Sequence, residues 1–219
     1  MNSDLTPGSA AYNRRVLSLY DPFVLGFSNL FVWRCPSREI LALYNQYVSA
    51  RHLDIGVGTG YFLDKCRFPS LSPEIALLDL NQNSLEVTAE RLRRYKPLTF
   101  RANILEPLKL GVAPFQSIGM NYLLHCLAGD MASKAVVFQN VKPLLAKGGV
   151  VFGSTILAVG VPRNRLAKRF MDAYNARGLF GNTHDSLEGL EAALKAHFPR
   201  YTLSVRGCVA LFAGHSSAE

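Results

Sequence analysis

The sequence predicts an α/β fold with a doubly wound, mostly parallel, seven-stranded sheet that ends in an antiparallel hairpin. Short apolar runs alternate with helical segments along most of the chain, and such alternation is typical of parallel sheets with helices on both faces. A glycine-rich turn at 56–60 joins the first run to the next helix. The last two runs meet at Arg206 and Gly207, which predicts a hairpin. A length of 219 residues with 49% hydrophobic content fits one compact domain.

Each strand is predicted from a short apolar run bounded by turn-forming or polar residues. The predicted strands cover 51–57, 74–80, 98–105, a run within 114–127 that ends near Met120, 150–159, 200–207 and 208–215. In sheets of this kind, ligands bind at the carboxyl ends of the strands, where the strand order reverses. The glycine turn that follows the first strand therefore lies at the expected binding edge.

The helix predicted at 38–48 repeats apolar residues at spacings of three and four, which gives it one buried face. Further helices are predicted at 61–68, 83–96, 131–147, 163–177 and 184–198, and residues 11–48 are expected to be mostly helical. An Asn or Ser cap opens the helix at 83–96, and Asp185 or Ser186 caps the last helix. Gly148 and Gly149 are expected to stop the helix at 131–147 before the next strand.

Composition narrows the class of protein but leaves the role of the basic charge open. The first residues lack the pattern of a secretory leader, and the apolar run at 22–33 is too short and too polar to span a bilayer. Four cysteines without C-x-x-C spacing argue against a zinc site and fit free thiols in a reducing compartment. We therefore expect a cytoplasmic protein with no membrane partner. The formal charge of +8 is compatible with nucleic acid, an anionic substrate or a basic solvated surface.

The glycine turn matches neither of two common phosphate-binding patterns. The stretch "LDIGVGTGYF" places three glycines within 56–60 after Asp54, in the pattern D-x-G-x-G-x-G. A dinucleotide-binding turn needs G-x-G-x-x-G, but the third glycine position holds Tyr61 in one register and Leu63 in the other. A P-loop is excluded because no G-K-[ST] follows. The turn therefore suits a different cofactor.

With its surroundings, the turn resembles the first motif of the class I S-adenosylmethionine-dependent methyltransferases. Four further segments resemble later motifs of that family in the same order: "LLDLNQNSLEVTAER", "RANILEPL", "MNYLLHCL" and "VKPLLAKGGVVFGST". Lys147 stands where the family usually has proline, and Val57 where cysteine or alanine is commoner. The resemblance covers residues 40–214. It implies a Rossmann-like methyltransferase fold, S-adenosyl-L-methionine as cofactor, and methyl transfer by in-line SN2 displacement.

The resemblance also implies which residues hold the cofactor. Glycines let the backbone approach the methionine part closely, and Asp54 would accept hydrogen bonds through the turn or, by a water, from the ammonium group. Asp79 follows the turn by about 20 residues, where doubly wound folds place an acid against ribose hydroxyls. Asn103 stands where the family reads the adenine amino group, and its amide oxygen can accept that hydrogen bond. The expected cofactor-binding residues are Asp54, Gly56, Gly58, Gly60, Asp79, Leu80, Asn103, Ile104 and Asn121.

The acceptor is expected to be a small molecule of the natural-product kind. The segment "NYLLHC" lacks the N-P-P-Y box of adenine-N6 methyltransferases and the aspartates of catechol-type enzymes, so no catalytic metal is expected. The sequence also lacks the paired glutamates of protein arginine methyltransferases and an RNA-binding extension. What remains resembles the small-molecule branch, in which an N-terminal helical lid segment, here 1–48, closes over a methyltransferase core, here 49–219. Phe31 and Trp33 of this lid are expected to pack on the sheet.

Two residues are predicted to act near the transferred methyl group. Tyr20 lies in the expected lid, and the resemblance implies a place over the methionine part or the sulfonium, which an aromatic face attracts. His125 follows the fourth strand and is a candidate general base for a hydroxyl or protonated amine, or else a pocket wall. A loop at 178–186, with Asn182 and His184, is a second candidate for the acceptor side, and a solvent-exposed loop is the favoured interpretation of His184.

Two other functions stay open. One is an RNA or protein methyltransferase that uses the basic clusters "ERLRRYK" and "RNRLAKR", although nucleic acid is not the expected partner. The other is a protein that binds S-adenosylmethionine and uses the sulfonium charge to assist a non-methylating reaction such as a cyclisation. The mass of the product distinguishes methyl transfer from the latter. A homodimer is compatible with the sequence.

Overall fold

The computed structural model describes residues 28–217, so the expectations for Tyr20 and the rest of 1–27 lie outside the described residues. Within them, one mixed sheet has the strand order β3-β2-β1-β4-β5-β7-β6. The strands are β1 (Arg51–Ile55), β2 (Glu74–Asp79), β3 (Leu98–Arg101), β4 (Phe115–Asn121), β5 (Leu145–Ile156), β6 (Arg200–Arg206) and β7 (Val209–His215). Neighbouring strands among β1 to β5 pair in parallel, whereas β7 runs antiparallel to both β5 and β6. The predicted doubly wound sheet with a terminal hairpin is confirmed.

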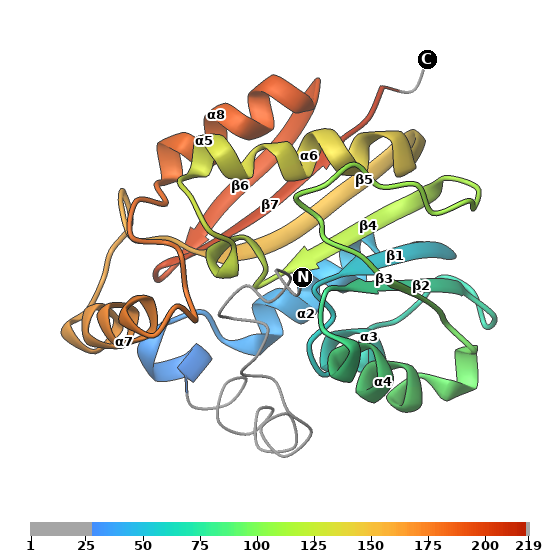
Figure 1. The fold of residues 1–219 in the computed structure, drawn as a ribbon, viewed down its shortest axis with the longest axis horizontal. Helices are drawn as coiled ribbons and strands as arrows, with labels where there is room; N and C mark the ends of the chain where they lie inside the picture. Colours follow the sequence, from blue (N-terminus) through green and yellow to red (C-terminus); the bar gives the residue numbers. More distant parts are fainter. Residues whose placement is uncertain (1–27, 218–219) are drawn as a thin grey trace, which may run out of the picture.

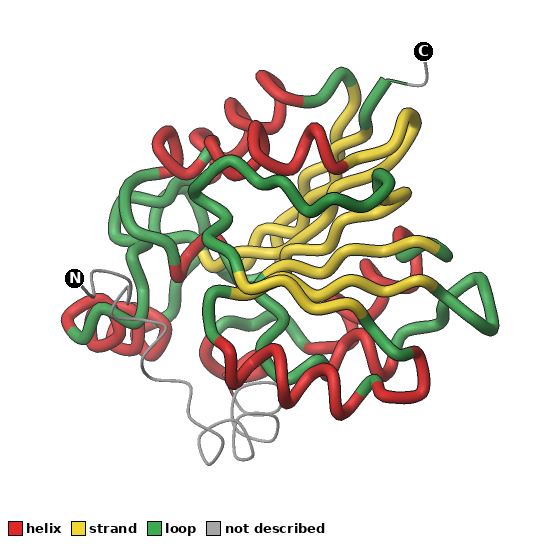
Figure 2. The backbone as a smooth tube through the Cα atoms, turned by 45° about the vertical axis from the view of Figure 1, so that its right-hand side comes forward, coloured by secondary structure: helices red, strands yellow, loops and turns green. Residues whose placement is uncertain are grey.

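Helices cover both faces of this sheet (Figure 1). They are α2 (Ser37–Tyr47), α3 (Tyr61–Lys65), α4 (Gln82–Arg91), α5 (Met131–Lys134), α6 (Val136–Val141), α7 (Arg165–Ala176) and α8 (Leu187–His197), with 3-10 turns η3 (Arg93–Tyr95), η4 (Leu124–Cys126) and η5 (Lys142–Leu144). Helices α2, α3 and α4 lie on one face, and α5, α6 and α8 lie on the other. Figure 2 shows the same layers from the side, with the twisted sheet between them.

Each face of the sheet packs its own apolar core. On one face, Tyr44 of α2 meets Phe152 of β5 edge-on, with ring centroids 5.2 Å apart. On the other, Phe138 of α6 meets Phe212 of β7 at 5.8 Å. Burying side chains of this size contributes about 1.5–3 kcal/mol each, and strands covered on both faces read as continuous apolar runs. These cores fix the position of the strand ends that carry the site.

The caps and the last hairpin agree with the sequence, apart from the residue that caps α4. Asn81, rather than Asn83 or Ser84, accepts from the backbone at the start of α4. Ser186 caps α8 by accepting a hydrogen bond from the Gly189 N–H at 2.9 Å. Strands β6 and β7 are joined by two residues, and the first of them, Gly207, has a φ of +58°. Glycine adopts that conformation without the strain that other residues meet.

The helix expected at 131–147 and its glycine stop are different in the structure. The helical run breaks at Ala135 and ends with η5, which contains Pro143, so β5 already begins at Leu145. Leu145 pairs with Phe115, and a register shift follows along β4. Gly148, with a φ of +69°, therefore lies inside the strand. The two glycines allow an irregular strand rather than stopping the helix.

The segment 28–36 connects the start of α2 to the carboxyl end of the sheet. Trp33 is buried and packs against Phe170 and Phe180, with ring centroids 6.5 and 5.9 Å away. Trp33 is therefore buried, but these ring partners belong to α7 (Arg165–Ala176) and the loop at 178–186 and not to the sheet as predicted. Phe31 is 56% exposed, so its predicted packing is wrong. Only Ser37–Tyr47 is α-helical in the described part of 11–48, because Pro36 precedes it and the chain before it forms a wider π-type turn.

Candidate active site at the carboxyl ends of the strands

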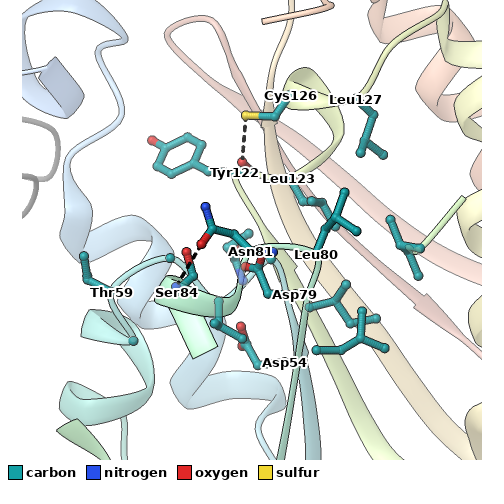
Figure 3. Close-up of a pocket in the computed structure, with 18 of the residues that line it drawn as sticks. Asp54, Thr59, Asp79, Leu80, Asn81, Ser84, Tyr122, Leu123, Cys126 and Leu127 are labelled. Atoms are coloured by element: carbon teal, nitrogen blue, oxygen red, sulfur yellow. Dashed lines mark hydrogen bonds between the residues drawn. The ribbon is translucent and has the colours of Figure 1, made fainter. Parts of the chain in front are cut away.

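A cavity opens where the strand order reverses, beside the carboxyl ends of β1, β2 and β4 (Figure 3). Strand β1 has β2 on one side and β4 on the other, so the loops after these strands diverge and leave space between them. All nine residues predicted to bind the cofactor line this cavity: Asp54, Gly56, Gly58, Gly60, Asp79, Leu80, Asn103, Ile104 and Asn121. The structure therefore brings together what the motifs predicted.

The three glycines of the turn have positive φ values but different surroundings. Their φ angles are +70° at Gly56, +55° at Gly58 and +71° at Gly60. A Cβ on Gly60 would lie 2.6 Å from a Thr88 methyl, and one on Gly56 would lie 2.8 Å from Leu123. A Cβ on Gly58 would meet nothing within 4 Å. Two glycines thus permit close packing, while the backbone of Gly58 stays open to a ligand in the cavity.

Asp79 ends β2 beside the glycine turn. Burial raises the pKa of its carboxyl to about 6, although the backbone N–H groups of Asn81, Gly58 and Val57 act in the opposite direction. The Asn81 N–H donates to Oδ1 at 2.8 Å. At neutral pH the group is therefore mostly ionised, and it offers a half-buried acceptor to the hydroxyl groups of a ligand.

The Asn121 side chain, at the end of β4, is buried and lines the cavity. Neither Oδ1 nor Nδ2 has a hydrogen bond of ordinary geometry to a described residue, although the amide lies close enough to the Tyr44 hydroxyl to act on its pKa in the lowering direction. A buried polar group without a partner costs about 1–3 kcal/mol, and such groups usually meet a ligand or water. This amide and the open face of Gly58 fit a polar cofactor with both donors and acceptors.

Asn103 follows the end of β3 and lines the cavity. Its Oδ1 accepts from the Leu105 N–H at 3.1 Å, and its Nδ2 donates to Glu106 at 3.1 Å. An amide oxygen has two lone pairs, so one remains for an amino group of a ligand. The neighbouring Ile104 is buried and adds an apolar wall.

The other end of the cavity is apolar. Leu123, Cys126 and Leu127 lie there, away from the carboxylates of Asp54 and Asp79 (Figure 3). Burial raises the pKa of the Cys126 thiol to about 12, so it stays protonated. Among the described residues that line the cavity, none is a His, Lys, Arg or Glu. This end therefore suits an apolar group and supplies no base of ordinary strength at neutral pH.

The structure does not bring His125 to the cavity wall. Its ring is buried in η4, accepts from the Ile156 N–H at 3.4 Å and lies 4.5 Å from the Phe180 ring. Burial, with a smaller effect of Lys134, lowers the pKa of the imidazole to about 3. A group with so low a pKa accepts a proton poorly, so the geometry favours the wall-supporting alternative over the base.

The loop at 178–186 borders the cavity through Leu179, and not through the polar residues that the sequence analysis proposed. Asn182 is fully buried and donates to the Ile156 carbonyl at 3.0 Å, so its predicted contact with substrate is wrong. His184 is exposed. The loop is held by Lys134, whose Nζ donates to Asp185 at 2.7 Å and to the Gly181 carbonyl at 2.9 Å.

Sequence reasoning missed several residues of the site. Tyr44 lines the cavity from α2, and its hydroxyl donates to Asp54 at 2.7 Å. Tyr122 adopts a φ of +55° after β4, and its hydroxyl donates to Asn29 at 3.0 Å. Helical periodicity marks Tyr44 only as a buried position. The contact of Tyr122 joins the segment 28–36 to the cavity, and no local pattern predicts it.

Residues 28–217 contain neither a membrane span nor a cluster of metal ligands. No helix in that range is long and apolar enough to cross a membrane. In the same range, no three His, Cys, Asp or Glu side chains are grouped so that they could hold a metal ion.

The sheet is doubly wound, a glycine turn follows β1, an acid ends β2, and the cavity lies between them. Together these features are those of a Rossmann-like S-adenosylmethionine-dependent methyltransferase. Comparisons with known proteins agree. The family model described as "Methyltransferase domain" matches residues 53–151. The chain is 40% identical to demethylluteothin O-methyltransferase of Streptomyces thioluteus, over 97% of this chain and 92% of that protein.

Other similar proteins extend this result. The physcion biosynthesis cluster O-methyltransferase of Aspergillus chevalieri is 38% identical, over 95% of this chain and 96% of that protein. N-methyltransferase NodS of Bradyrhizobium japonicum, solved with S-adenosyl-L-homocysteine, has the same fold with a TM-score of 0.63 and 16% identity, over 98% of this chain and 100% of that chain. The chain belongs to the class I S-adenosylmethionine-dependent methyltransferases, and the predicted family, enzyme class and cofactor are confirmed.

Proposed function

We propose that the protein methylates an acidic hydroxyl group, a phenol or an enol, on a largely apolar small molecule. The observation that carries this proposal is the apolar end of the cavity, which would take the acceptor and is called the acceptor end. It is lined by Leu123, Cys126, Leu127 and Leu179, and no strong base lines it in the described part of the chain. A hydroxyl that ionises by itself near neutral pH needs no general base from the protein. The names of the two relatives compared above, both O-methyltransferases, support oxygen as the methylated atom.

The residues of the cavity would hold the cofactor in a fixed orientation. We assign Asp79 to the ribose hydroxyls, Asn103 with Ile104 to the adenine, and Asp54 with Asn121 to the methionine part, beside the open backbone of Gly58. When bound, S-adenosyl-L-methionine supplies a methyl group on a positively charged sulfur. The protein then contributes mainly the alignment of the two reactants and the exclusion of water. Holding two reactants in line can lower the barrier of a reaction by about 7–11 kcal/mol.

The proposed reaction balances without a further reactant. The acceptor hydroxyl releases its proton to solvent, and its oxygen then forms a bond to the methyl carbon while the carbon–sulfur bond breaks. The electron pair of that bond would leave with the sulfur, so the second product would be S-adenosylhomocysteine, a neutral thioether. The apolar wall removes water from the ionised oxygen, and an oxygen with less water around it attacks the methyl carbon more readily.

The test uses phenols and hydroxypyrones whose pKa values span about 6 to 10, the upper limit being that of an ordinary phenol. We expect O-methylated products that have gained one methylene, and a kcat/KM that rises with pH up to the pKa of each acceptor. The proposal is wrong if methylation occurs at nitrogen or carbon. With the cofactor at saturating concentration at every pH, it is also wrong if the rate falls at the same acidic pH for every acceptor, because a group of the protein would then be the base.

We also propose that nucleic acid is not the acceptor. Several basic side chains of the two clusters pair with acids of the protein itself: Arg93 with Glu90 at 2.6 Å, Arg94 with Asp64 at 2.7 Å and Lys168 with Asp172 at 2.9 Å. Such pairs reduce the electrostatic field that a polyanion would experience.

We propose a cytoplasmic location for the protein. The four cysteines are free, as is usual for proteins of a reducing compartment.

A further inference from the structure

Two short patterns on neighbouring strands face each other in register. Strand β1 carries His52 and Asp54, two residues apart, and β4 carries Ser117 and Gly119 with the same spacing. The parallel register places His52 opposite Ser117 and Asp54 opposite Gly119. Because side chains alternate along a strand, these four positions lie on one face of the sheet.

A chain of hydrogen bonds runs along this face to the cavity. The Ser49 and Ser117 hydroxyls are 2.7 Å apart, and Ser117 Oγ is 2.8 Å from His52 Nδ1. His52 Nε2 is 3.3 Å from Oδ2 of Asp54, to which the Tyr44 hydroxyl also donates at 2.7 Å. A carboxylate only accepts, so Nε2 carries the proton in this contact. His52 and Ser117 are fully buried and do not line the cavity, whereas Asp54 and Tyr44 do.

Both hydrogen bonds end on the same oxygen of Asp54. Within the described part of the chain, no side chain or backbone group donates to Oδ1. Burial, with the neighbouring Asp54 as a second cause, raises the pKa of Tyr44 well above its ordinary value, so the phenol remains a donor. Oδ2 is thereby fixed from two sides, and Oδ1 is left for a ligand.

Gly119 provides the room that this arrangement needs. A Cβ at this position would lie 2.7 Å from Oδ2 of Asp54 and 3.2 Å and 3.3 Å from Cε1 and Nε2 of His52. Any larger residue would push the imidazole and the carboxylate apart. Gly119, which lies opposite Asp54, is therefore needed for the same arrangement as His52 and Ser117.

We propose that His52, Ser117 and Gly119 are positioning residues that hold Asp54 with Oδ1 turned to the cavity, and so determine the affinity for the amino-acid end of the cofactor. This proposal does not depend on the identity of the acceptor, since it concerns cofactor binding alone. It depends on the assignment of Asp54 to the methionine part, which the same experiment tests.

The first test replaces the imidazole without losing its packing. His52→Phe keeps a ring against Phe152 and Phe68, whose centroids lie 5.8 and 6.4 Å from that of His52, but removes both nitrogens. Calorimetry would measure the dissociation constants of S-adenosylhomocysteine and of 5′-methylthioadenosine, which lacks the amino-acid part. We expect binding of S-adenosylhomocysteine to weaken about tenfold or more, as for a lost hydrogen bond to a charged group, and that of 5′-methylthioadenosine to stay unchanged. An equal loss for both ligands, or no loss for either, overturns the proposal.

A second test measures whether His52 acts through Asp54. In the Asp54→Asn background, His52→Phe should add little further loss of affinity for S-adenosylhomocysteine, because the group that it orients is already altered. Fully additive losses overturn the proposal. Should His52→Phe fail to fold, Ser117→Ala and Gly119→Ala replace it in both experiments. His52→Gln, which keeps a donor and an acceptor, should recover part of the affinity, and its failure to do so in a folded protein counts against the proposed hydrogen bonds.

Discussion

Asp79 gives cofactor binding a dependence on pH. Its pKa of about 6 in the folded protein, raised by burial, lies above the ordinary 3.8, so the folded form holds this proton more tightly than the unfolded form does. Through this group alone, the free energy of unfolding is highest below pH 3.8 and falls as the pH rises through about 6. A ligand that donates hydrogen bonds to the carboxylate recovers part of that loss.

We therefore predict that the affinity for S-adenosylhomocysteine falls as the pH is lowered through about 6, by up to tenfold for each unit below the midpoint. Calorimetry at a series of pH values measures this. Asp79→Asn should bind more weakly at neutral pH and lose this dependence. A parent profile that is flat between pH values of about 5 and 8 contradicts the assignment of Asp79 to the cofactor.

The backbone at Gly58 is predicted to border the ligand. Gly58→Val should abolish binding of S-adenosylhomocysteine, a loss of about 100-fold or more, because the side chain fills the ligand's path. Gly111→Val is the matched control: its φ is +66° against +55° at Gly58, and a Cβ at either position meets nothing within 4 Å. Both variants should lose stability by a similar amount, about 1–2 kcal/mol for a left-handed conformation, and unchanged affinity in Gly58→Val would refute the role.

His125 is predicted to support the wall of the cavity and not to transfer a proton. Its buried ring and a pKa of about 3 mean that it is neutral throughout the working range of pH. His125→Gln should lower kcat less than tenfold and leave the pH profile unchanged. A loss of about 10²-fold or more, with a flattened acidic limb, would instead identify His125 as the base.

At the scale of elements, the buried ion pair of Lys134 and Asp185 joins α5 to the loop that precedes α8. Both side chains are fully buried, and burial is the main cause that lowers the pKa of Lys134 and raises that of Asp185. The pair also holds the Gly181 carbonyl, and Leu179 of the same loop lines the acceptor end of the cavity. The stability of the loop and the shape of the acceptor site are therefore connected.

Lys134→Met should lower the free energy of unfolding by about 3–5 kcal/mol, because it leaves the Asp185 carboxyl buried without its partner. Urea unfolding measures this, and the double variant Lys134→Met/Asp185→Leu should recover much of the loss. The exposed pair of Lys168 and Asp172 is the control, and Lys168→Met should change stability by about 1 kcal/mol or less. In the folded double variant, we expect a higher KM for the acceptor and an unchanged affinity for S-adenosylhomocysteine. If cofactor affinity falls as well, the pair is not specific to the acceptor side.

The elements that the sequence predicts well are those whose signals are local. The strands β1, β2 and β4 are mostly buried on both faces, and the spacing of Asp54, the glycines and Asp79 fixes their places around the turn. The start of β5 could not be predicted, because it depends on pairing with Phe115 across the sheet. The burial of a side chain is equally non-local: "LHC" does not disclose that His125 packs against Phe180 and does not line the cavity. The roles of Tyr44 and Lys134 could not be predicted either, because each depends on contacts with a segment distant in sequence.

At the scale of the whole molecule, the net charge of +8 should have little effect on the reaction. With a small acceptor, we predict that kcat/KM changes less than about threefold between 50 and 200 mM salt, whereas a polyanion held by six or more phosphate contacts loses about 10³-fold or more in affinity over that range. Steady-state rates at several salt concentrations, with RNA as a competitor, check this. Tight and salt-sensitive inhibition by RNA would contradict the proposal of a small acceptor.

The docking of the segment 28–36 affects the order in which parts of the chain can fold during synthesis. Trp33 accepts a hydrogen bond from the Cys208 N–H at 3.1 Å, and a Cβ at Gly207 would collide with the same Trp33 carbonyl. The turn between β6 and β7 is thus the surface on which an early part of the chain rests, and that early part reaches the cavity through Asn29 and Tyr122. During synthesis, chains emerge from the N-terminus and domains fold as units. The segment 28–36 therefore leaves the ribosome well before the hairpin that supports it, so we expect its contact with Tyr122 at the cavity to become stable only after the last hairpin has been released.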